Sequence, residues 1–253
     1  MTVPDIRLVP LASGAGRPLL VGPSLGTRVA AVWGPTVPLL GDRPVYGWDL
    51  PGHGVSPAAT SGFTIAELAT GIASAADTVG LSTFAVAGVS LGGLASLAVA
   101  QQLGSRVTSV TQICSLPQLG TASGWGERAA QIRASGTPSV VQGSAARWFA
   151  PGFIESSPTL SSGLLRDLMD VDDESYALCA ELLGSTDLRP SVASLTVPYT
   201  LIEGAVDVVV PLEAAEAAVA SARDGRLEVL PGVAHLATVE DPASVARILS
   251  EVS

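Results

Sequence analysis

A serine flanked by glycines is the residue best suited to do chemistry in this chain. The segment Gly88-Val-Ser-Leu-Gly92-Gly93 follows an apolar run typical of a buried strand and precedes small residues typical of a helix. A sharp strand-to-helix turn would raise the Ser90 hydroxyl above the sheet, and its strained backbone requires neighbours without side chains. The segment therefore predicts a nucleophilic Ser90, with the Leu91 N–H at a helix N-terminus facing a developing oxyanion.

A nucleophilic serine needs a general base, and this chain contains only two histidines. His235 follows a strand-like run, and Asp207 follows the strand-like run before it. The order serine, acid, histidine, with each residue beyond a strand, predicts a catalytic triad of Ser90, Asp207 and His235. Glu203 is the alternative acid, but it lies nearer the strand body and has less freedom to reach the histidine.

The second histidine lies in the segment Asp49-Leu-Pro-Gly-His53-Gly-Val-Ser56. The glycines on both sides of it indicate a tight turn. His53 precedes Ser90 in the chain and follows no strand that carries an acid, so it does not fit the order expected for a base. We interpret it as a turn residue that packs or hydrogen-bonds locally.

The elements that must position these residues alternate between two patterns. Short apolar runs predict strands, and between them lie helical patterns, the first opened by the capping-box pair Thr64 and Glu67. The predicted strands cover residues 18–22, 44–50, 84–88, 107–114, 199–203 and 227–230, and the predicted helices cover residues 64–80, 90–102, 212–222 and 242–251. This alternation predicts an α/β fold, a mostly parallel sheet with helices on both faces.

One region departs from the alternation. Between residues 119 and 190 only helical patterns are present, around residues 127–135, 139–149, 159–171 and 175–183. We expect a helical cap at 119–190, inserted after the fourth predicted strand, and a core formed by 1–118 and 191–253. The cap would cover the carboxyl ends of the strands, where ligands bind in open α/β sheets.

Composition excludes several classes of function. All 13 basic residues are Arg, which rules out a Schiff-base lysine and a Walker-type phosphate loop. A net charge of −10 without any basic run argues against nucleic acid. No apolar run reaches the roughly 18 residues that span a bilayer. The N-terminus lacks the pattern of a signal peptide, so we expect a cytoplasmic protein with Cys114 and Cys179 reduced.

A second oxyanion donor is expected from the loop Gly22-Pro-Ser-Leu-Gly-Thr27, which follows the first predicted strand. Pro23 has no N–H, so Ser24 or Leu25 must donate, and we assign Leu25.

Together these residues resemble the α/β-hydrolase superfamily and, within it, the bacterial 3-oxoadipate enol-lactonases of the β-ketoadipate pathway. The elbow around Ser90 marks only the superfamily. The narrower resemblance lies in Ser24-Leu-Gly-Thr27, Arg147-Trp-Phe-Ala-Pro151 and Thr186-Asp-Leu-Arg-Pro190. Enol-lactonases often carry Asn-Ser in the oxyanion loop, so Pro23 departs from their pattern.

The resemblance implies hydrolysis of 3-oxoadipate enol-lactone to 3-oxoadipate, a step in aromatic compound degradation. Ser90 would attack the lactone carbonyl, His235 would move the proton, and the Leu25 and Leu91 N–H groups would hold the oxyanion. This chemistry requires no metal and no cofactor, and its partner is a small lactone or ester.

The implied substrate carries a carboxylate, which the acidic protein would repel unless a local cation offsets the charge. The first half of the predicted cap is the less acidic half. We expect Arg133, or Arg147 beside Trp148, to hold the carboxylate, and Trp125 and Trp148 to wall the pocket. The alternatives are arginines paired with nearby helix acids and tryptophans that pack between cap and core.

Three other functions remain compatible with parts of this pattern. A carboxylesterase or a lactonase of different specificity would share the triad, as would a cofactor-free haloperoxidase-like or C–C bond hydrolase. A haloalkane dehalogenase is disfavoured because the elbow carries Ser90 instead of Asp. A non-catalytic binding protein is disfavoured because it has no need of Ser90, Asp207 and His235 together.

Overall fold

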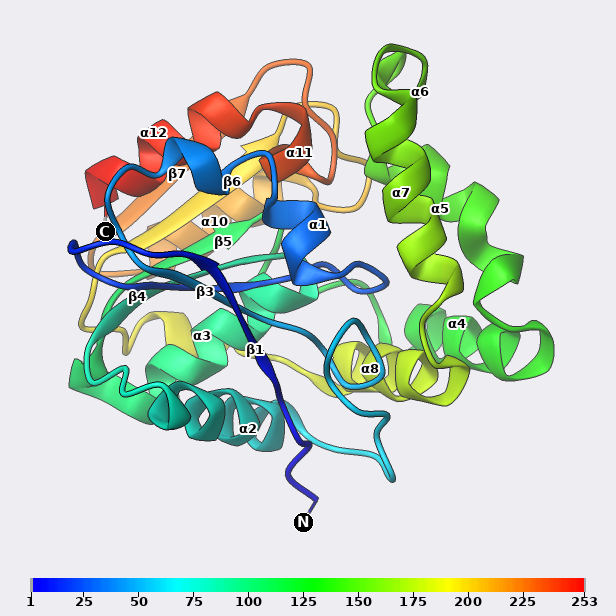
Figure 1. The fold of residues 1–253 in the computed structure, drawn as a ribbon, viewed down its shortest axis with the longest axis horizontal. Coiled ribbons are helices and arrows are strands. Elements are labelled where there is room, and N and C mark those ends of the chain that lie inside the picture. The colour runs from blue at the N-terminus through cyan, green and yellow to red at the C-terminus, as the bar shows by residue number, and fades with distance from the viewer. Residues whose placement is uncertain (1, 253) are drawn as a thin grey trace.

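A seven-stranded sheet forms the centre of the protein (Figure 1). The computed structural model describes residues 2–252. The strands lie in the order β1-β3-β2-β4-β5-β6-β7, with β1 antiparallel to β3 and every other pair parallel. Their bounds are β1 (Leu8–Ala12), β2 (Leu19–Gly22), β3 (Val45–Trp48), β4 (Phe84–Val89), β5 (Val107–Ile113), β6 (Tyr199–Gly204) and β7 (Gly225–Leu230). The prediction of a mostly parallel α/β sheet is confirmed.

All six strands predicted from the sequence are present, with bounds that differ by at most two residues. Strands β2, β4 and β6 are buried along their whole length. Central parallel strands are covered on both faces, so they read as continuous apolar runs. Strand β1 was missed because it is an edge strand, half-exposed and interrupted by Pro10, and therefore lacks that signal.

Helices cover both faces of the sheet. In Figure 1, α2 and α3 lie on one face, whereas α1 and α12 lie on the other. The core helices are α1 (Val29–Trp33), α2 (Ile65–Thr78), α3 (Leu91–Leu103), α9 (Arg189–Val192), α10 (Leu212–Ser221), α11 (Ala237–Glu240) and α12 (Pro242–Val252). The core also contains the 3₁₀ turns η1 (Val37–Leu39) and η2 (Gly104–Arg106), whereas the 3₁₀ turn η3 (Thr137–Val140) lies within the helical segment that follows β5. The predicted capping box begins α2: the Glu67 N–H donates to Thr64 Oγ1, and the Thr64 N–H donates to Glu67 Oε2.

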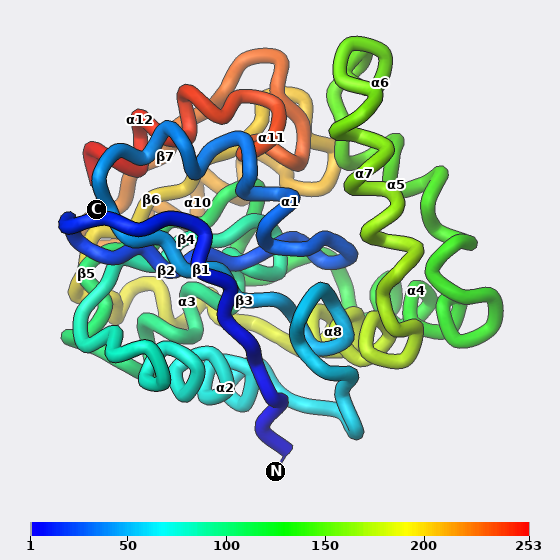
Figure 2. Tube along the Cα trace, viewed as in Figure 1, coloured from blue at the N-terminus to red at the C-terminus, as the bar shows by residue number. Residues whose placement is uncertain are grey.

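Five helices, which we call the cap, follow β5. They are α4 (Ala122–Ser135), α5 (Val141–Trp148), α6 (Phe153–Ser156), α7 (Pro158–Met169) and α8 (Asp173–Ser185). No strand occurs in the chain between residues 114 and 198, as expected. Figure 2 shows this stretch of the chain standing beyond one end of the sheet. The domain bounds at 118/119 and 190/191 stay predictions.

Contacts with the core hold the cap over the carboxyl ends of the strands. Arg28, which precedes α1, forms ion pairs with Asp167 and Asp170 at the end of α7. The Asp172 N–H donates to the Gly52 carbonyl oxygen at 3.1 Å. The catalytic candidates therefore lie between the sheet and the cap. In the described chain, 2–252, none of the helices is long and apolar enough to cross a membrane; the cytoplasmic location stays a prediction.

Candidate active site

Ser90 occupies the turn between β4 and α3 in a strained conformation. Its φ of 54° and ψ of −119° lie outside the regions that residues with a side chain usually adopt. The neighbouring glycines are required by contact: a Cβ at Gly88 would lie 2.2 Å from the Gly92 backbone, and a Cβ at Gly92 would lie 2.5 Å from the Pro23 carbonyl oxygen. The turn is therefore a nucleophile elbow, the geometry that the glycine spacing predicts.

His235 and Asp207 form the second part of the site. His235 Nδ1 lies 2.8 Å from Asp207 Oδ2, and the two side chains are 4% and 0% exposed. The Val209 N–H donates to Asp207 Oδ1 at 2.7 Å, so the loop after β6 holds the carboxylate in place. A buried carboxylate fixes the tautomer of the imidazole and stabilises its protonated form, as a triad acid does.

Glu203, the alternative acid, is buried at the end of β6. One of its oxygens accepts the Ser115 N–H at 3.3 Å, whereas Oε2 has no partner within residues 2–252. Burial, followed by the charge of Asp207, raises the pKa of Glu203 well above its usual range and so favours the neutral form. The position next to His235 therefore belongs to Asp207.

The loop that carries His235 is also tied to the cap. Glu240 in α11 accepts two backbone N–H groups, from Ala150 at 2.6 Å and from Ala234 at 2.5 Å. On the other side of the histidine, the Leu236 N–H donates to the Trp148 carbonyl oxygen at 3.3 Å. Sequence reasoning missed Glu240, because an acid in a short helix carries no signal of a contact with the cap.

The oxyanion loop, residues 22–27, lies beside the elbow. The Gly92 N–H donates to the Pro23 carbonyl oxygen at 2.9 Å, and both the N–H and the hydroxyl of Thr27 donate to the Ser24 carbonyl oxygen. Pro23 contributes only its carbonyl oxygen to these hydrogen bonds, so none of them depends on the N–H that proline lacks. Within residues 2–252 the Leu25 and Leu91 N–H groups donate to no other group, which leaves both available to a ligand oxygen.

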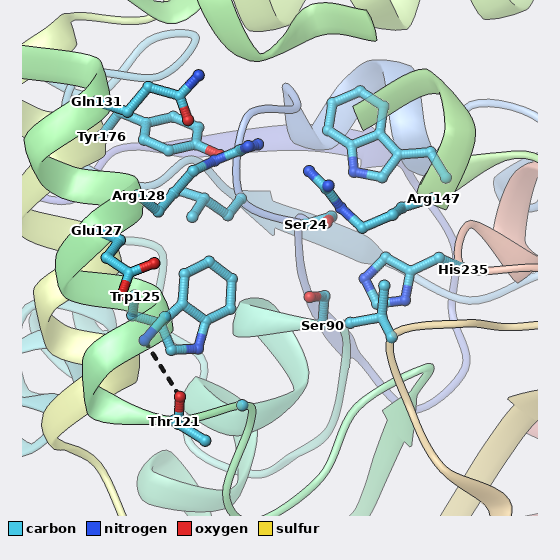
Figure 3. Close-up of a pocket in the computed structure, with 15 residues that line it drawn as sticks. Ser24, Ser90, Thr121, Trp125, Glu127, Arg128, Gln131, Arg147, Tyr176 and His235 are labelled. Atoms are coloured by element: carbon cyan, nitrogen blue, oxygen red, sulfur yellow. Dashed lines mark hydrogen bonds between the residues drawn. The ribbon is translucent and has the colours of Figure 1, made fainter. Parts of the chain in front are cut away.

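A cavity of about 510 Å³ opens above Ser90 (Figure 3). It brings together most of the predicted site residues and adds several that were not predicted. Its walls comprise Ser24, Leu25, Ser90, Thr121, Trp125, Glu127, Arg128, Gln131, Arg147, Trp148, Tyr176, Val209 and His235. Asp207 contacts His235 from outside the cavity, and Leu91 is buried and does not line the cavity.

Two arginines face each other across this cavity (Figure 3). Arg147 is partly buried and forms no ion pair or hydrogen bond within the described chain. Burial, and then the charge of Arg128, lowers its pKa from the usual range. Arg128 donates to Ser144 Oγ at 2.9 Å and to the Tyr176 hydroxyl at 3.2 Å, and likewise has no acidic partner among residues 2–252. The cavity therefore holds two arginines that form no ion pair with an acid among residues 2–252.

Sequence reasoning did not single out Arg128. It lies one helical turn after Trp125 in α4, so the two side chains share a face. This three-residue spacing is the sequence signal that could have identified Arg128 as a residue of the same pocket. Glu127, also in α4, lines the cavity beside Trp125 and Arg128 (Figure 3), and it accepts the Ser123 hydroxyl.

Arg133 corrects one expectation. It lies on the exposed face of α4, where it pairs with Glu174 at 2.7 Å and also with Glu181, both in α8. The hydrogen bonds to these two acids raise its pKa above the usual range. Arg133 follows Arg128 by five residues, which places it about 140° further round the helix. It therefore points away from the cavity and cannot hold a ligand there.

A parallel α/β sheet with a nucleophile elbow, and a histidine–carboxylate pair at the carboxyl ends of its strands, defines a hydrolase architecture. The chain belongs to the α/β hydrolase family, whose sequence pattern matches residues 11–248. It is 31% identical to 3-oxoadipate enol-lactonase 2 of Acinetobacter baylyi, over 100% of this chain and 95% of the relative. It is 28% identical to 3-oxoadipate enol-lactonase 1 of the same organism, over 90% and 85%.

Among solved structures, the enol-lactonase from Burkholderia xenovorans LB400 superposes with a TM-score of 0.93. Its sequence identity is 24%, and the match covers 98% of this chain and 95% of that one. At this identity the likeness shows the fold alone.

Proposed function

We propose that this protein is a serine hydrolase that opens a small lactone carrying a carboxylate, with 3-oxoadipate enol-lactone as the leading candidate. The observation that carries the proposal is the partly buried Arg147, which has no acidic partner in residues 2–252 and lines the same cavity as Ser90 and His235. The full-length similarity to an enol-lactonase supports the same substrate.

The proposed reaction uses groups of the chain alone. His235 takes the proton of Ser90 while Oγ attacks the lactone carbonyl, and Asp207 stabilises the imidazolium. The Leu25 and Leu91 N–H groups hold the oxyanion of the tetrahedral intermediate. As the ring opens to an acyl-enzyme, His235 gives the proton to the departing enol oxygen, and the enol then tautomerises to the ketone. A water activated by His235 then releases the diacid, and neither a metal nor a cofactor enters any step.

The proposed role of Arg147 follows from charge. Removing a guanidinium from water costs free energy, and the neighbouring Arg128 adds repulsion. A substrate carboxylate between the two would offset both costs through charge-assisted hydrogen bonds, each contributing about 1.5–3 kcal/mol. It would also overcome the repulsion expected from the −10 net charge.

The aromatic side chains of the cap shape the proposed pocket. Trp125 donates its indole N–H to the Leu119 carbonyl oxygen at 2.7 Å, so its polar edge is already occupied. Trp148 is buried, and its carbonyl oxygen supports the His235 loop. We therefore assign both indoles an apolar contact with the lactone ring, not a hydrogen bond to it.

The experiment compares two substrates. Arg147→Met keeps the apolar stem and removes the charge. We expect kcat/KM for the enol-lactone to fall by about 10- to 100-fold, because one charge-assisted contact is lost. Hydrolysis of the neutral p-nitrophenyl acetate should change by less than about 2-fold.

Arg133→Met is the matched control, since its side chain lies outside the cavity, and it should change neither rate. Ser90→Ala should abolish both activities. If Arg147→Met and Arg128→Met leave the ratio of the two rates unchanged, the carboxylate role of this cavity is wrong.

A second candidate function, a carboxylesterase with a larger substrate, is favoured by the volume of the cavity. About 510 Å³ falls in the range of pockets for drug-sized ligands, roughly 300–1,000 Å³. Under this alternative, longer neutral p-nitrophenyl esters would be turned over faster than the enol-lactone, and Arg147→Met would not slow them.

A further inference from the structure

His53, which the proposed reaction does not use, contacts the oxyanion loop. It lies in the loop after β3 and is 1% exposed. Its Nε2 lies 3.1 Å from the Gly26 nitrogen, and its Nδ1 lies 2.8 Å from the Pro51 carbonyl oxygen. A carbonyl only accepts, so Nδ1 carries the hydrogen and Nε2 presents its lone pair to the Gly26 N–H.

These two hydrogen bonds leave the imidazole with no free nitrogen. His53 therefore cannot act as a general base, which agrees with its place before Ser90 in the chain. Burial lowers its pKa to about 4, so the ring is neutral at physiological pH and the Nε2 lone pair stays available to Gly26.

The bond to Gly26 completes the support of the oxyanion loop. The Pro23 and Ser24 carbonyl oxygens are held by Gly92 and Thr27. The bond from Gly26 to His53 fixes the peptide plane that joins Leu25 and Gly26, at a residue whose φ is +87°. The Leu25 N–H belongs to the Ser24–Leu25 peptide, which Thr27 holds through the Ser24 carbonyl oxygen. With the peptides on both sides of the Leu25 Cα restrained, this N–H is held as the free donor of the loop.

The other face of the imidazole connects to the cap. The His53 ring stacks on Tyr176 of α8, with ring centroids 6.4 Å apart and planes inclined by 19°. The Tyr176 hydroxyl accepts from Arg128, whose guanidinium lies 5.8 Å from the centre of the tyrosine ring. A continuous series of contacts thus runs from the oxyanion loop through His53 and Tyr176 to a cation of the cavity.

We propose that His53 is a positioning residue for the oxyanion hole: the Nε2 acceptor fixes the Leu25–Gly26 peptide so that the Leu25 N–H meets the developing oxyanion. This inference rests on the proposed serine hydrolase function. The hydrogen bond acts on the transition state, because the substrate carbonyl carries less charge before the attack. Loss of the acceptor should therefore lower kcat and leave KM nearly unchanged.

The experiment uses two substitutions of His53 in the full chain. His53→Phe keeps a ring against Tyr176 and removes the acceptor, whereas His53→Gln places an amide oxygen near the position of Nε2. For p-nitrophenyl acetate we expect His53→Phe to lower kcat by about 10- to 100-fold, less than the 10²–10³-fold that follows loss of a whole oxyanion donor. His53→Gln should recover kcat to within about 3-fold of wild type.

A tetrahedral inhibitor separates positioning from general damage. A trifluoromethyl ketone that adds to Ser90 places its oxyanion in the hole, so His53→Phe should weaken its binding by the same factor as kcat/KM. Adipate, which binds without reacting, should keep its affinity.

Val107→Ala is the stability control. It removes two methyl groups from a buried side chain at the start of β5, the end of the strand opposite the catalytic loops. It should lower the thermal midpoint without changing kcat.

Three results would overturn the proposal: a wild-type kcat in His53→Phe, equal loss of affinity for adipate and the ketone, or no recovery in His53→Gln. Failure of the proposed function is seen separately in the wild type, as turnover of the ester without turnover of the enol-lactone. In that case the comparison of His53 variants on the ester still decides the role of His53.

Discussion

Protonation of His53 makes the stability of this protein sensitive to mild acid. The folded chain holds the ring neutral, with its pKa lowered by burial from 6.5 to about 4, although the Pro51 carbonyl and the charge of Asp172 act in the opposite direction. Between these two pH values the unfolded chain binds a proton that the folded chain refuses. The contribution of His53 to stability is therefore complete above pH 6.5 and is lost as the pH falls towards 4.

The size of the effect follows from the shift. One pKa unit corresponds to about 1.4 kcal/mol, so a fall from 6.5 to about 4 amounts to about 3 kcal/mol once the pH is below both values. At pH 5 the part already lost is about 2 kcal/mol. Against a total free energy of unfolding of roughly 5–15 kcal/mol, a change of this size is readily measured.

Urea unfolding followed by circular dichroism at pH 7.5, 6 and 5 measures it. His53→Gln does not titrate, so the stability difference between wild type and this variant should narrow by about 2 kcal/mol from pH 7.5 to pH 5. The buried carboxyls of Asp49, Glu203 and Glu240 titrate in both proteins and cancel in the difference. The control Val107→Ala carries no titrating group and should keep a constant difference from wild type. A pH-independent difference between wild type and His53→Gln would refute the reasoning.

Three further predictions concern the elbow, the acid and the thiols. Gly88→Ala should prevent the elbow from forming, because the new Cβ would lie 2.2 Å from the Gly92 backbone. Labelling of Ser90 by a fluorophosphonate should then disappear. The control Gly163→Ala, whose new Cβ would meet no atom of a neighbouring element within 4 Å, should be labelled as the wild type is. Asp207→Asn should lower kcat by about 10⁴-fold, because the imidazole tautomer is no longer fixed. Glu203→Gln should keep kcat within about 3-fold, because Glu203 bonds to Ser115 and not to His235. Equal losses in steady-state assays would make Glu203 the functional acid. Cys114 and Cys179 are both buried, and desolvation raises the pKa of each thiol. Ellman's reagent should therefore detect no fast-reacting thiol in the native protein and both thiols in urea. Rapid labelling of either thiol in the native protein would contradict their burial.

The α/β class and the positions of six of the seven strands could be read from the sequence. The signal is clearest for β2, β4 and β6, because a buried parallel strand must be apolar along its whole length. The elbow was equally readable, since its constraint is local: Ser90 needs its glycines whatever the rest of the chain does. The order of Ser90, Asp207 and His235 beyond their strands was enough to predict the His235–Asp207 contact. The strands run parallel, so their carboxyl ends meet at one edge of the sheet.

The cap shows what depends on packing between helices. Arg128, Arg133 and Arg147 are equivalent as residue types. The rotation of α4 against α8 decides that Arg133 pairs with Glu174 while Arg128 faces the cavity, and the placement of α5 brings Arg147 to the same cavity. A weakly amphipathic helix with glycines in its first turns does not indicate which face it buries.

The same limit applies to His53. The local sequence indicates a tight turn around His53, but its hydrogen-bond partner Gly26 lies in the loop after β2, whereas His53 lies in the loop after β3. Two loops separated in sequence meet only because β2 and β3 are neighbours in the sheet. Residue types and spacing were thus sufficient wherever chemistry or backbone geometry acts within a few residues. The tertiary structure decided which charges remain unpaired and which buried nitrogen supports the oxyanion loop, because both depend on contacts between distant segments.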